Sequence, residues 1–345
     1  MSGAVVRPPA RGFPAWAGPE ARLRHLLGYA VQAPSRYNAQ PWLFEIEGDG
    51  LAVFADRRRA LRAADPQGRE AAIACGAALE NARVAAAHHG HAAEVETGQA
   101  RGVGEPLARL WLGARAAPRL ADELLFRAIP LRRSSGSVQT ALLPEALQGS
   151  LREEAARLGC ALRPVPPMHH RALAALAAEA DAEQWASPRF RAEQAIWTRP
   201  ALRTPAPAPA RAAGVLGRLL QRFSGTGREL DRRIGAQLAG LLLLSTRGDE
   251  PADWVAAGRA LQAVLLRAAA AGLEASYLSP PLEVPGVRQR LRRAIFEAGH
   301  PQVLLRLGRG TVLRTPRRRP VELVLRAFAP AVEVRVGEES AVEAA

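Results

Sequence analysis

Hydrophobic and polar positions along the chain follow two alternating periods, which predict helices and strands in succession. Near residues 19–32, Leu23, Leu26 and Leu27 recur at helical spacing. The runs "WLFEIE" and "LAVFAD" follow, separated by Gly-Asp-Gly, a pattern typical of a β-hairpin. Residues 65–90 then predict a turn and a long helix of closely spaced small residues that ends at Gly90.

The same alternation continues to the end of the chain. Strands are predicted at "AEVE", "PLARLWLG", "CALRPV", residues 237–246, "EASYLS" and "PQVLLRLG". Helices are predicted at residues 144–158 and 253–272 and from about residues 167 and 285 onward. A layered α+β architecture is therefore expected.

One stretch, residues 185–230, breaks this pattern. It contains Trp185, Trp197 and many prolines, but few periodic apolar positions. A connection of this length without regular structure is usually a functional lid or a linker. Its tryptophans favour a segment that packs against the rest of the protein.

Composition limits the class of protein. The 345 residues, 48% of them hydrophobic, suffice for a real core. No apolar run approaches the roughly 20 residues that span a bilayer, and the start lacks a signal-peptide pattern, so we expect a cytoplasmic protein without a membrane partner. Residues 1–18 and 331–345 are expected to be a flexible arm and a flexible tail. Cys75 and Cys160 form no disulfide or metal framework and are expected to be buried.

The formal charge of +14 raises the question of whether the protein binds nucleic acid. All 47 basic residues are arginine and none is lysine, a composition typical of a coding bias. The arginines are spread along the chain and accompany no nucleic-acid-binding motif, so no nucleic-acid partner is predicted. Some of these arginines could instead bind a phosphate group.

The common catalytic signatures are absent. The chain has no dinucleotide-binding glycine motif after a strand, no P-loop, no zinc-protease motif and no nucleophile elbow. His88, His89 and His91 end a predicted helix, where histidine suits the helix C-terminus, and we expect no metal site. No side chain is predicted as a catalytic acid or base.

The segment "APSRYNAQPW", residues 33–42, is unusual between a helix and a strand. Ala33 precedes Pro34, so the helix should stop there. Ser35 and Asn38 are common turn formers and could simply cap and turn the chain. That interpretation leaves Gln40 and the Pro-Trp pair after it unexplained.

Four segments, in this order, resemble the nitroreductase family of flavoproteins, specifically its Acg-like branch. They are the Pro-Ser-x-x-Asn-x-Gln-Pro-Trp segment, "DPQGRE" with its following helix, "RRSS" at 132–135, and the C-terminal third from "DWVAAG" through "PPLE" and "PQVLLRLGRG" to "TPRRRP". The resemblance covers about residues 20–325.

The resemblance implies a nitroreductase-like, FMN-dependent α+β fold. In the Acg-like branch one chain resembles an intramolecular domain-swapped dimer with a lid insertion. Residues 19–128 would form the first half and residues 129–330 the second, with the lid at about 185–230. The protein would be a monomer resembling a dimer, or a homodimer.

The resemblance also implies the cofactor-binding residues. The first segment would lie against the flavin, and the "RRSS" element would hold the phosphate. Backbone near "PPLE" would hydrogen-bond the flavin N5, and a C-terminal arginine could also reach the phosphate. The implied residues are Pro34, Ser35, Asn38, Gln40, Arg69, Arg132, Ser134, Pro281, Glu283, Val284, Arg317 and Arg318.

Simpler alternatives remain for these segments. "RRSS" could be a solvated basic loop, and "PPLE" could be a plain strand-to-helix connection. Gly136 stands where the family usually has a further basic residue, so the phosphate grip could shift to the C-terminal arginines.

Two functions are compatible with the resemblance. The first is an FMN-binding oxidoreductase that transfers hydride from NAD(P)H through the flavin to a small-molecule acceptor such as a nitroaromatic compound or a quinone. The alternative is an FMN-sequestering storage protein with little reductase activity, in which Trp185 and Trp197 of the lid cover the site.

Overall fold

The computed structural model describes residues 12–98, 104–136, 138–140, 142–198, 238–295, 299–310 and 316–326. The helices are α1 (Pro19–Ala30), α2 (Arg69–His88), α3 (Leu120–Ala128), α4 (Glu145–Ala156), α5 (His170–Ala186), α6 (Pro188–Trp197), α9 (Pro251–Ala270), α10 (Pro280–Glu283) and α11 (Pro285–Ile295). The strands are β1 (Trp42–Glu47), β2 (Gly50–Ala55), β3 (His91–Thr97), β4 (Ala108–Arg115), β5 (Val138–Thr140), β6 (Ala161–Pro164), β7 (Leu241–Thr246), β8 (Glu274–Tyr277) and β9 (His300–Gly310). This mixed α+β content confirms the predicted fold class.

The first sheet contains four antiparallel strands in the order β1-β2-β4-β3. The predicted hairpin is confirmed, but Glu47 pairs with Gly50, so the turn is only Gly48-Asp49 and the last glycine of the Gly-Asp-Gly run joins the ladder. Buried leucines of α1 and the alanine-rich α2 pack on this sheet with Trp42 and Phe44. The small residues of α2 let this helix lie close to its neighbours on several sides.

The second sheet is also antiparallel, in the order β5-β9-β7-β6, with β8 pairing on β9 as well. Helices α4 and α9 pack on one face through a core that includes Leu261 and Leu305. Helices α5 and α11 pack on the other face around Leu173 and Leu304. Because both faces are covered, β7 and β9 read as nearly continuous apolar runs.

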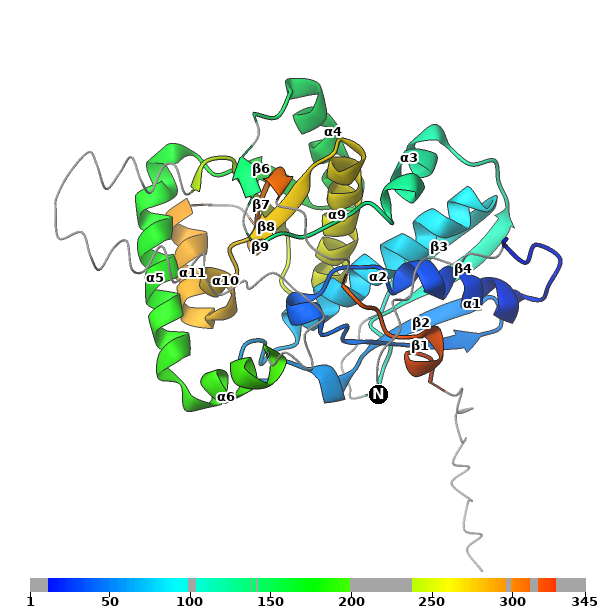
Figure 1. Cartoon of the computed structure of the whole chain (residues 1–345), viewed down its shortest axis with the longest axis horizontal. Helices are drawn as coiled ribbons and strands as arrows, with labels where there is room; N and C mark the ends of the chain where they lie inside the picture. The colour runs from blue at the N-terminus through cyan, green and yellow to red at the C-terminus, as the bar shows by residue number, and fades with distance from the viewer. Residues whose placement is uncertain are drawn as a thin grey trace, which may run out of the picture.

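Helices α2 and α9 cross between the two sheets (Figure 1). A Cβ atom on Gly76 would lie 2.2 Å from the carbonyl oxygen of Val255, and one on Gly258 would lie 1.9 Å from that of Ile73. Gly76 of α2 thus lies against Val255, three positions before Gly258. In the same way, Gly258 of α9 lies against Ile73, three positions before Gly76. The two close contacts are therefore reciprocal.

The C-terminal segment returns to the first sheet (Figure 1). The amide of Phe44 donates to the carbonyl of Val324 at 2.7 Å, and the amide of Arg326 donates to the carbonyl of Phe44 at 2.8 Å. Residues 316–326 therefore lie beside β1, although β9 just before them belongs to the second sheet. This return brings the C-terminal arginines close to residues 32–42.

Most remaining sequence predictions for single elements are confirmed, including the buried positions of Cys75 and Cys160. The prediction of an irregular segment from residue 185 is wrong for its first part. Trp185 lies in α5, and residues 188–197 form α6, whose first turn is capped by the Ser187 hydroxyl accepting from the Phe190 amide at 3.3 Å. Proline at the first position of a helix is favourable, which is why Pro188 begins this element. Residues 199–230 of the expected lid lie outside the described residues.

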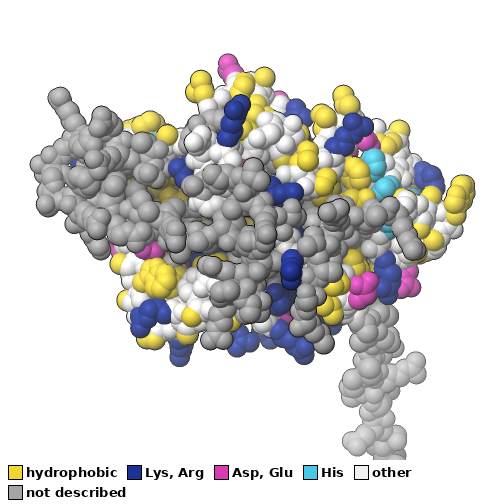
Figure 2. Space-filling model, viewed as in Figure 1, with side chains coloured by type: hydrophobic (Ala, Val, Ile, Leu, Met, Phe, Trp, Pro, Cys, Tyr) yellow, Lys and Arg dark blue, Asp and Glu magenta, His cyan; other side chains and the backbone are white. Residues whose placement is uncertain are grey.

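Two further features concern the surface. On the face drawn in Figure 2 the visible arginine side chains are spread over the surface, between apolar and acidic side chains.

Phe13, from the expected N-terminal arm, stacks on His89 with ring centroids 4.3 Å apart. In the described part of the chain, no helix has the length and apolar character to cross a bilayer.

Candidate functional site

The loop that connects α1 to β1 has an unusual backbone. Tyr37, Asn38 and Gln40 have φ values of 49°, 55° and 51°, in the left-handed region that side chains other than glycine rarely occupy. Such residues cost of order 1–3 kcal/mol each and persist only where the surroundings fix them. The backbone strain therefore suggests that the loop belongs to a functional site, and the hydrogen bonds that hold the strained backbone can be identified.

Hydrogen bonds from inside and outside the loop hold this backbone. The Gln40 amide donates to the Ser35 hydroxyl oxygen at 2.9 Å. The Asn38 side-chain amide donates to the carbonyl of Arg317 at 2.8 Å, and the Arg319 amide donates to the Gln40 side-chain oxygen at 2.8 Å. Asn38 and Gln40 thus bind the C-terminal segment to the loop. Ser35 acts as the turn-stabilising residue that one of the two sequence interpretations predicted.

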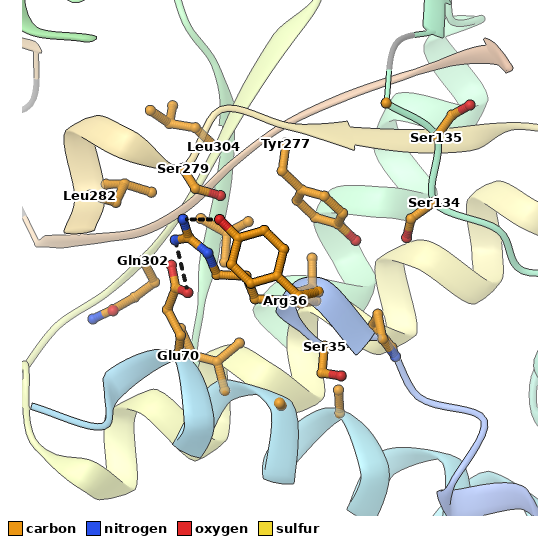
Figure 3. Close-up of a pocket in the computed structure, with 18 residues that line it drawn as sticks. Ser35, Arg36, Glu70, Ser134, Ser135, Tyr277, Ser279, Leu282, Gln302 and Leu304 are labelled. Carbon is orange, nitrogen blue, oxygen red and sulfur yellow. Dashed lines mark hydrogen bonds and ion pairs between the residues drawn. The ribbon is translucent and has the colours of Figure 1, made fainter. Parts of the chain in front are cut away.

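This loop forms one wall of a cavity of about 1020 Å³, counting the part that is open to solvent (Figure 3). The other walls are the first turns of α2, residues 134–136, the end of β8 with α10, and the start of β9. The lining residues are Pro34, Ser35, Arg36, Tyr37, Glu70, Ile73, Ala74, Ala77, Ser134, Ser135, Gly136, Leu261, Tyr277, Ser279, Leu282, Gln302, Val303 and Leu304. The fold thus brings together all four segments on which the sequence resemblance rests.

The cavity combines a smooth apolar side with a polar edge. Ala74 and Ala77 are one turn apart on α2, so no long side chain projects from that part of the wall. Hydroxyl groups gather at the other side, where Tyr277 extends from β8 with its hydroxyl directed toward Ser134 (Figure 3). Burial raises the pKa of Tyr277, so this hydroxyl stays protonated at neutral pH. Such a cavity suits a flat, partly polar ligand.

Two buried arginines lie behind the polar edge. Arg132 is 4% exposed and Arg318 is 6% exposed. Arg132 donates to the Ser134 hydroxyl at 3.0 Å, and Arg318 donates to the Asn38 side-chain oxygen and, at 2.9 Å, to the carbonyl of Gln32. Among the described residues neither makes an ion pair with a carboxylate, and the Nε atoms of both are buried without a hydrogen-bond partner.

The electrostatic consequence is an excess of buried positive charge. Burial, and then repulsion from Arg132 and Arg133, lowers the pKa of Arg318 to about 9, which still leaves it protonated at neutral pH. Burial also lowers the pKa of Arg132. Charges in this state are costly unless an anion neutralises them.

A different arginine, Arg36, is fully compensated. It lies between the carboxylates of Glu283, with which it forms an ion pair, and Glu70, whose Oε2 is 3.4 Å from its Nη1. It also donates to the Tyr37 hydroxyl at 2.9 Å. Burial would lower the pKa of Arg36, but Glu70 and Tyr37 outweigh it and raise the pKa. This side of the cavity is therefore close to neutral.

Arg69 supports the wall from outside. Its guanidinium donates to the carbonyl of Gln302 at 2.7 Å and to that of Leu282 at 3.3 Å. Gln302 and Leu282 line the cavity, so Arg69 positions two of its walls. It does not itself line the cavity.

Helix α6 is attached to residues 63–64 and to the loop that forms one wall of the cavity. The Glu193 carboxylate accepts hydrogen bonds from the amides of Ala63 and Ala64, both at 3.0 Å, and the Gln194 side chain donates to the Tyr37 hydroxyl. Trp197 packs beside Arg59, whose guanidinium carbon is 5.3 Å from the ring centroid, and Trp185 is 42% exposed. Neither tryptophan lines the large cavity.

The residues predicted from sequence fall into two groups. Pro34, Ser35 and Ser134 line the cavity. The others support its walls, lie behind them or are exposed: Asn38, Gln40, Arg69, Arg132, Pro281, Glu283, Val284, Arg317 and Arg318. Sequence reasoning missed Tyr277, Ser279 and Gln302, which lie in strands and their ends. It also passed over Arg36 and Tyr37, although they lie inside the segment that it singled out.

Comparison with known proteins gives a consistent picture. No family model matches the chain. A Mycobacterium tuberculosis protein named "Putative NAD(P)H nitroreductase Rv3131" is 32% identical over 302 residues, which cover 83% of this chain and 84% of that protein. "Putative NAD(P)H nitroreductase acg" from the same organism is 29% identical over 321 residues, 88% of this chain and 94% of that protein. "Uncharacterized protein Rv3127" is 28% identical over 327 residues, covering 88% and 92%.

Proposed function

The chain belongs to the nitroreductase family of oxidoreductases, in its Acg-like branch, and on this premise we propose that it binds one FMN in the large cavity and uses NAD(P)H to reduce a nitroaromatic compound, a quinone or a similar small acceptor. The single observation that carries the FMN assignment is the pair of buried, uncompensated arginines behind Ser134. A phosphate group supplies the anion that they lack.

The residues of the cavity fit the rest of that cofactor. The smooth wall at Ala74 and Ala77 leaves room for a flat ring system, and Ser35 offers a hydroxyl near it. Arg132 and Ser134 would hold the phosphate, with Arg318 close behind. Among the three C-terminal arginines, Arg318 is the buried one, whereas Arg317 is exposed.

When bound, FMN would supply the redox chemistry by accepting a hydride from the nicotinamide and passing electrons to the acceptor. The chain would supply orientation and exclusion of water. Tyr277 would keep a protonated hydroxyl inside the site, and the compensated Arg36 would keep the opposite side close to neutral.

The arrangement of the chain supports an internally duplicated, domain-swapped form of the family's dimer. The reciprocal crossing of α2 and α9 at Gly76 and Gly258 is what a two-fold axis would produce. In such a form, the return of residues 316–326 to the first sheet would be an exchange of one segment between the halves. Each wall segment of the cavity occurs once, so we expect one FMN per chain.

The experiment is direct. The purified chain should be yellow, should release FMN on acid treatment in a ratio near one per chain, and should lose its flavin absorption when NADPH or NADH is added without oxygen. A colourless chain that takes up no added FMN would contradict the proposal. A ratio near two would show a second site.

One observation favours the alternative function, FMN sequestration. Helix α6 is hydrogen-bonded through Glu193 to the amides of residues 63–64 and through Gln194 to Tyr37, which lines the cavity, so as part of a lid it would have to move before a nicotinamide could enter. If the closed form dominates, only the open fraction reacts and reduction is slow. Glu193→Ala combined with Gln194→Ala should then speed flavin reduction, whereas Arg189→Ala on the exposed side of α6 should not. If the flavin of the unmodified chain is reduced rapidly and neither the double variant nor the control changes the rate, sequestration is excluded and the oxidoreductase function stands.

A further inference from the structure

The end of α2 that lies away from the cavity carries a cluster of imidazole rings. His88 is the last residue of α2 and His89 follows it, while His25 lies on α1 and His91 begins β3. The ring centroids lie 4.8 Å apart for His88 and His89, and 5.2 Å apart for His25 and His89. In the part of the chain that the structure describes, no group of histidine, cysteine and acidic side chains is arranged to hold a metal ion. These four histidines form the imidazole cluster, and what they hold is an aromatic side chain.

That side chain is Phe13, which belongs to the arm, residues 12–18, that precedes α1. The Phe13 ring stacks on His89 with centroids 4.3 Å apart and an interplanar angle of 11°. It meets His25 edge-on at 5.4 Å and lies 5.8 Å from His91. Trp16 of the same arm, in contrast, is 98% exposed. Phe13 is thus the aromatic side chain that docks the arm on the body of the protein.

The members of the imidazole cluster differ in whether a proton on them would have a counter-charge. The Nε2 atoms of His25, His89 and His91 are buried and have no hydrogen-bond partner among the described residues. The Nδ1 atom of His88 lies 2.7 Å from a carboxylate oxygen of Glu123 on α3. A proton on His88 would therefore meet a negative charge. A proton on one of the other three would create a buried positive charge without a partner, which is unfavourable.

The surroundings accordingly favour the neutral form of these rings. Burial, and then repulsion from the other three members of the cluster, lowers the pKa of His89 to about 4, and burial lowers the pKa of His25. Tyr29 of α1, whose ring lies 6.1 Å from that of His89, has its pKa raised by burial and stays uncharged. Arg115, the partner of His91 in the β3–β4 ladder, adds a positive charge. The arm has no acidic or basic side chain between residues 12 and 18, so it offers a proton no counter-charge.

We propose that the imidazole cluster is a pH-sensitive latch for the arm: Phe13 is docked while His25, His89 and His91 are neutral, and the arm is released when these rings take up protons. Release opens the cluster to water, which solvates the imidazolium ions. Because the docked state disfavours the proton, docking is strongest above the ordinary histidine pKa of 6.5 and weakens as the pH falls toward 4. The latch lies at the opposite end of α2 from the cavity and does not rest on the proposed function.

The test places a dye on the arm of the full-length chain. Gly12→Cys offers a thiol at an exposed position, where a Cβ atom would have no neighbour within 4 Å. Cys75 and Cys160 are buried, which raises the pKa of both thiols, so a rhodamine maleimide reacts with the introduced thiol. We expect the fluorescence anisotropy to be high at pH 7.5 and to fall by pH 5, because the docking equilibrium constant decreases about tenfold. An anisotropy that stays constant while circular dichroism shows a folded chain would overturn the proposal.

Variants of the labelled chain distinguish the latch from a general effect of acid. Phe13→Ala should have a low anisotropy already at pH 7.5, whereas Trp16→Ala, at an exposed position in the same arm, is the matched control and should behave as the parent. His89→Phe keeps a ring on which Phe13 can stack but takes up no proton, so its anisotropy should fall less than half as far by pH 5. If Phe13→Ala equals the control at pH 7.5, or His89→Phe releases the arm as readily as the parent, the proposal is wrong. Should His89→Phe not fold, the titration of the parent and the comparison of Phe13→Ala with Trp16→Ala decide.

Discussion

Two clusters of buried charge in this protein differ in one respect, the presence of a counter-charge. The Glu80 cluster consists of Glu80, Arg83, Arg157 and Arg259, where α2 meets α9 and the end of α4. The Arg132 cluster consists of Arg132 and Arg318, behind the polar edge of the large cavity. Both bury ionised groups, which proteins normally avoid.

The Glu80 cluster is complete. The Glu80 carboxylate is fully buried and lies 2.7 Å from Nε of Arg83, 3.0 Å from Nε of Arg259 and 3.5 Å from a terminal nitrogen of Arg157. Burial would raise its pKa, but the three guanidinium groups outweigh burial and lower the pKa to about 2. Asp122, 2.9 Å from Arg83, and Glu154, 3.1 Å from Arg157, supply the remaining negative charges, so the cluster joins helices and needs no ligand.

The Arg132 cluster lacks the negative charge that would balance its two arginines. Its charges repel each other, and the described residues supply hydroxyl and carbonyl oxygens but no ion-paired carboxylate. The comparison teaches that buried charge by itself does not mark a ligand site. Buried charge without its counter-charge does.

The largest effect is expected from breaking the complete cluster. Glu80→Ala removes the one carboxylate that three arginines share and should lower the free energy of unfolding by about 3–5 kcal/mol. Denaturation in urea measures this, with Glu153→Ala on the exposed side of α4 as the control. FMN affinity of the folded fraction should not change. A loss below about 1 kcal/mol would mean that Glu80 is not the centre of this cluster.

Acid should have nearly the same effect on the unmodified chain. The folded pKa of Glu80 is about 2 and its ordinary value is 4.5, so its contribution is fully present above pH 4.5 and is lost as the pH falls toward 2. The loss should approach about 3 kcal/mol. Unfolding measured between pH 5 and 2.5 should therefore show a steeper slope for the wild type than for Glu80→Ala. Parallel slopes would contradict the assignment.

Breaking the incomplete cluster should affect the ligand instead of the fold. Arg132→Ala removes a charge-assisted contact and should weaken FMN binding about ten- to a hundredfold, or about 1.5–3 kcal/mol. Riboflavin lacks the phosphate and should bind wild type and variant alike. Arg127→Ala, exposed at the end of α3, is the matched control. Equal losses for FMN and riboflavin would indicate general damage to the cavity.

The smallest effect is expected from supplying the missing negative charge to the Arg132 cluster. Inorganic phosphate should stabilise the flavin-free chain by about 1 kcal/mol at a concentration several times its dissociation constant, because it neutralises Arg132 and Arg318. A thermal shift assay measures it. Arg132→Ala should abolish the shift, while Arg127→Ala and Glu80→Ala should retain it. A shift that persists in Arg132→Ala would show that the phosphate binds elsewhere.

Periodicity alone determined most of the elements. Helices α1, α2, α4 and α9 and the hairpin β1–β2 follow from patterns that depend only on the local repeat of apolar residues. Ser35 and Ser134 were also within reach of the sequence, because they belong to short motifs whose order along the chain resembles a known family. The sequence was misleading after residue 185. There α5 packs on the second sheet and α6 packs on the loop at residues 61–64, and no local pattern of apolar residues predicts these contacts.

Tertiary structure decided which residues form the site and in what state of charge. Three consecutive arginines, Arg317 to Arg319, are equivalent in the sequence, yet only the path of the chain beside β1 buries Arg318 and leaves Arg317 exposed. Tyr277 reads as an ordinary strand residue until β8 brings it to the cavity opposite the loop of Arg36. The physical reason is that a charge is compensated or uncompensated according to its neighbours in space. For Glu80 the partners come from 3, 77 and 179 residues away, and for Arg132 the described part of the fold brings none.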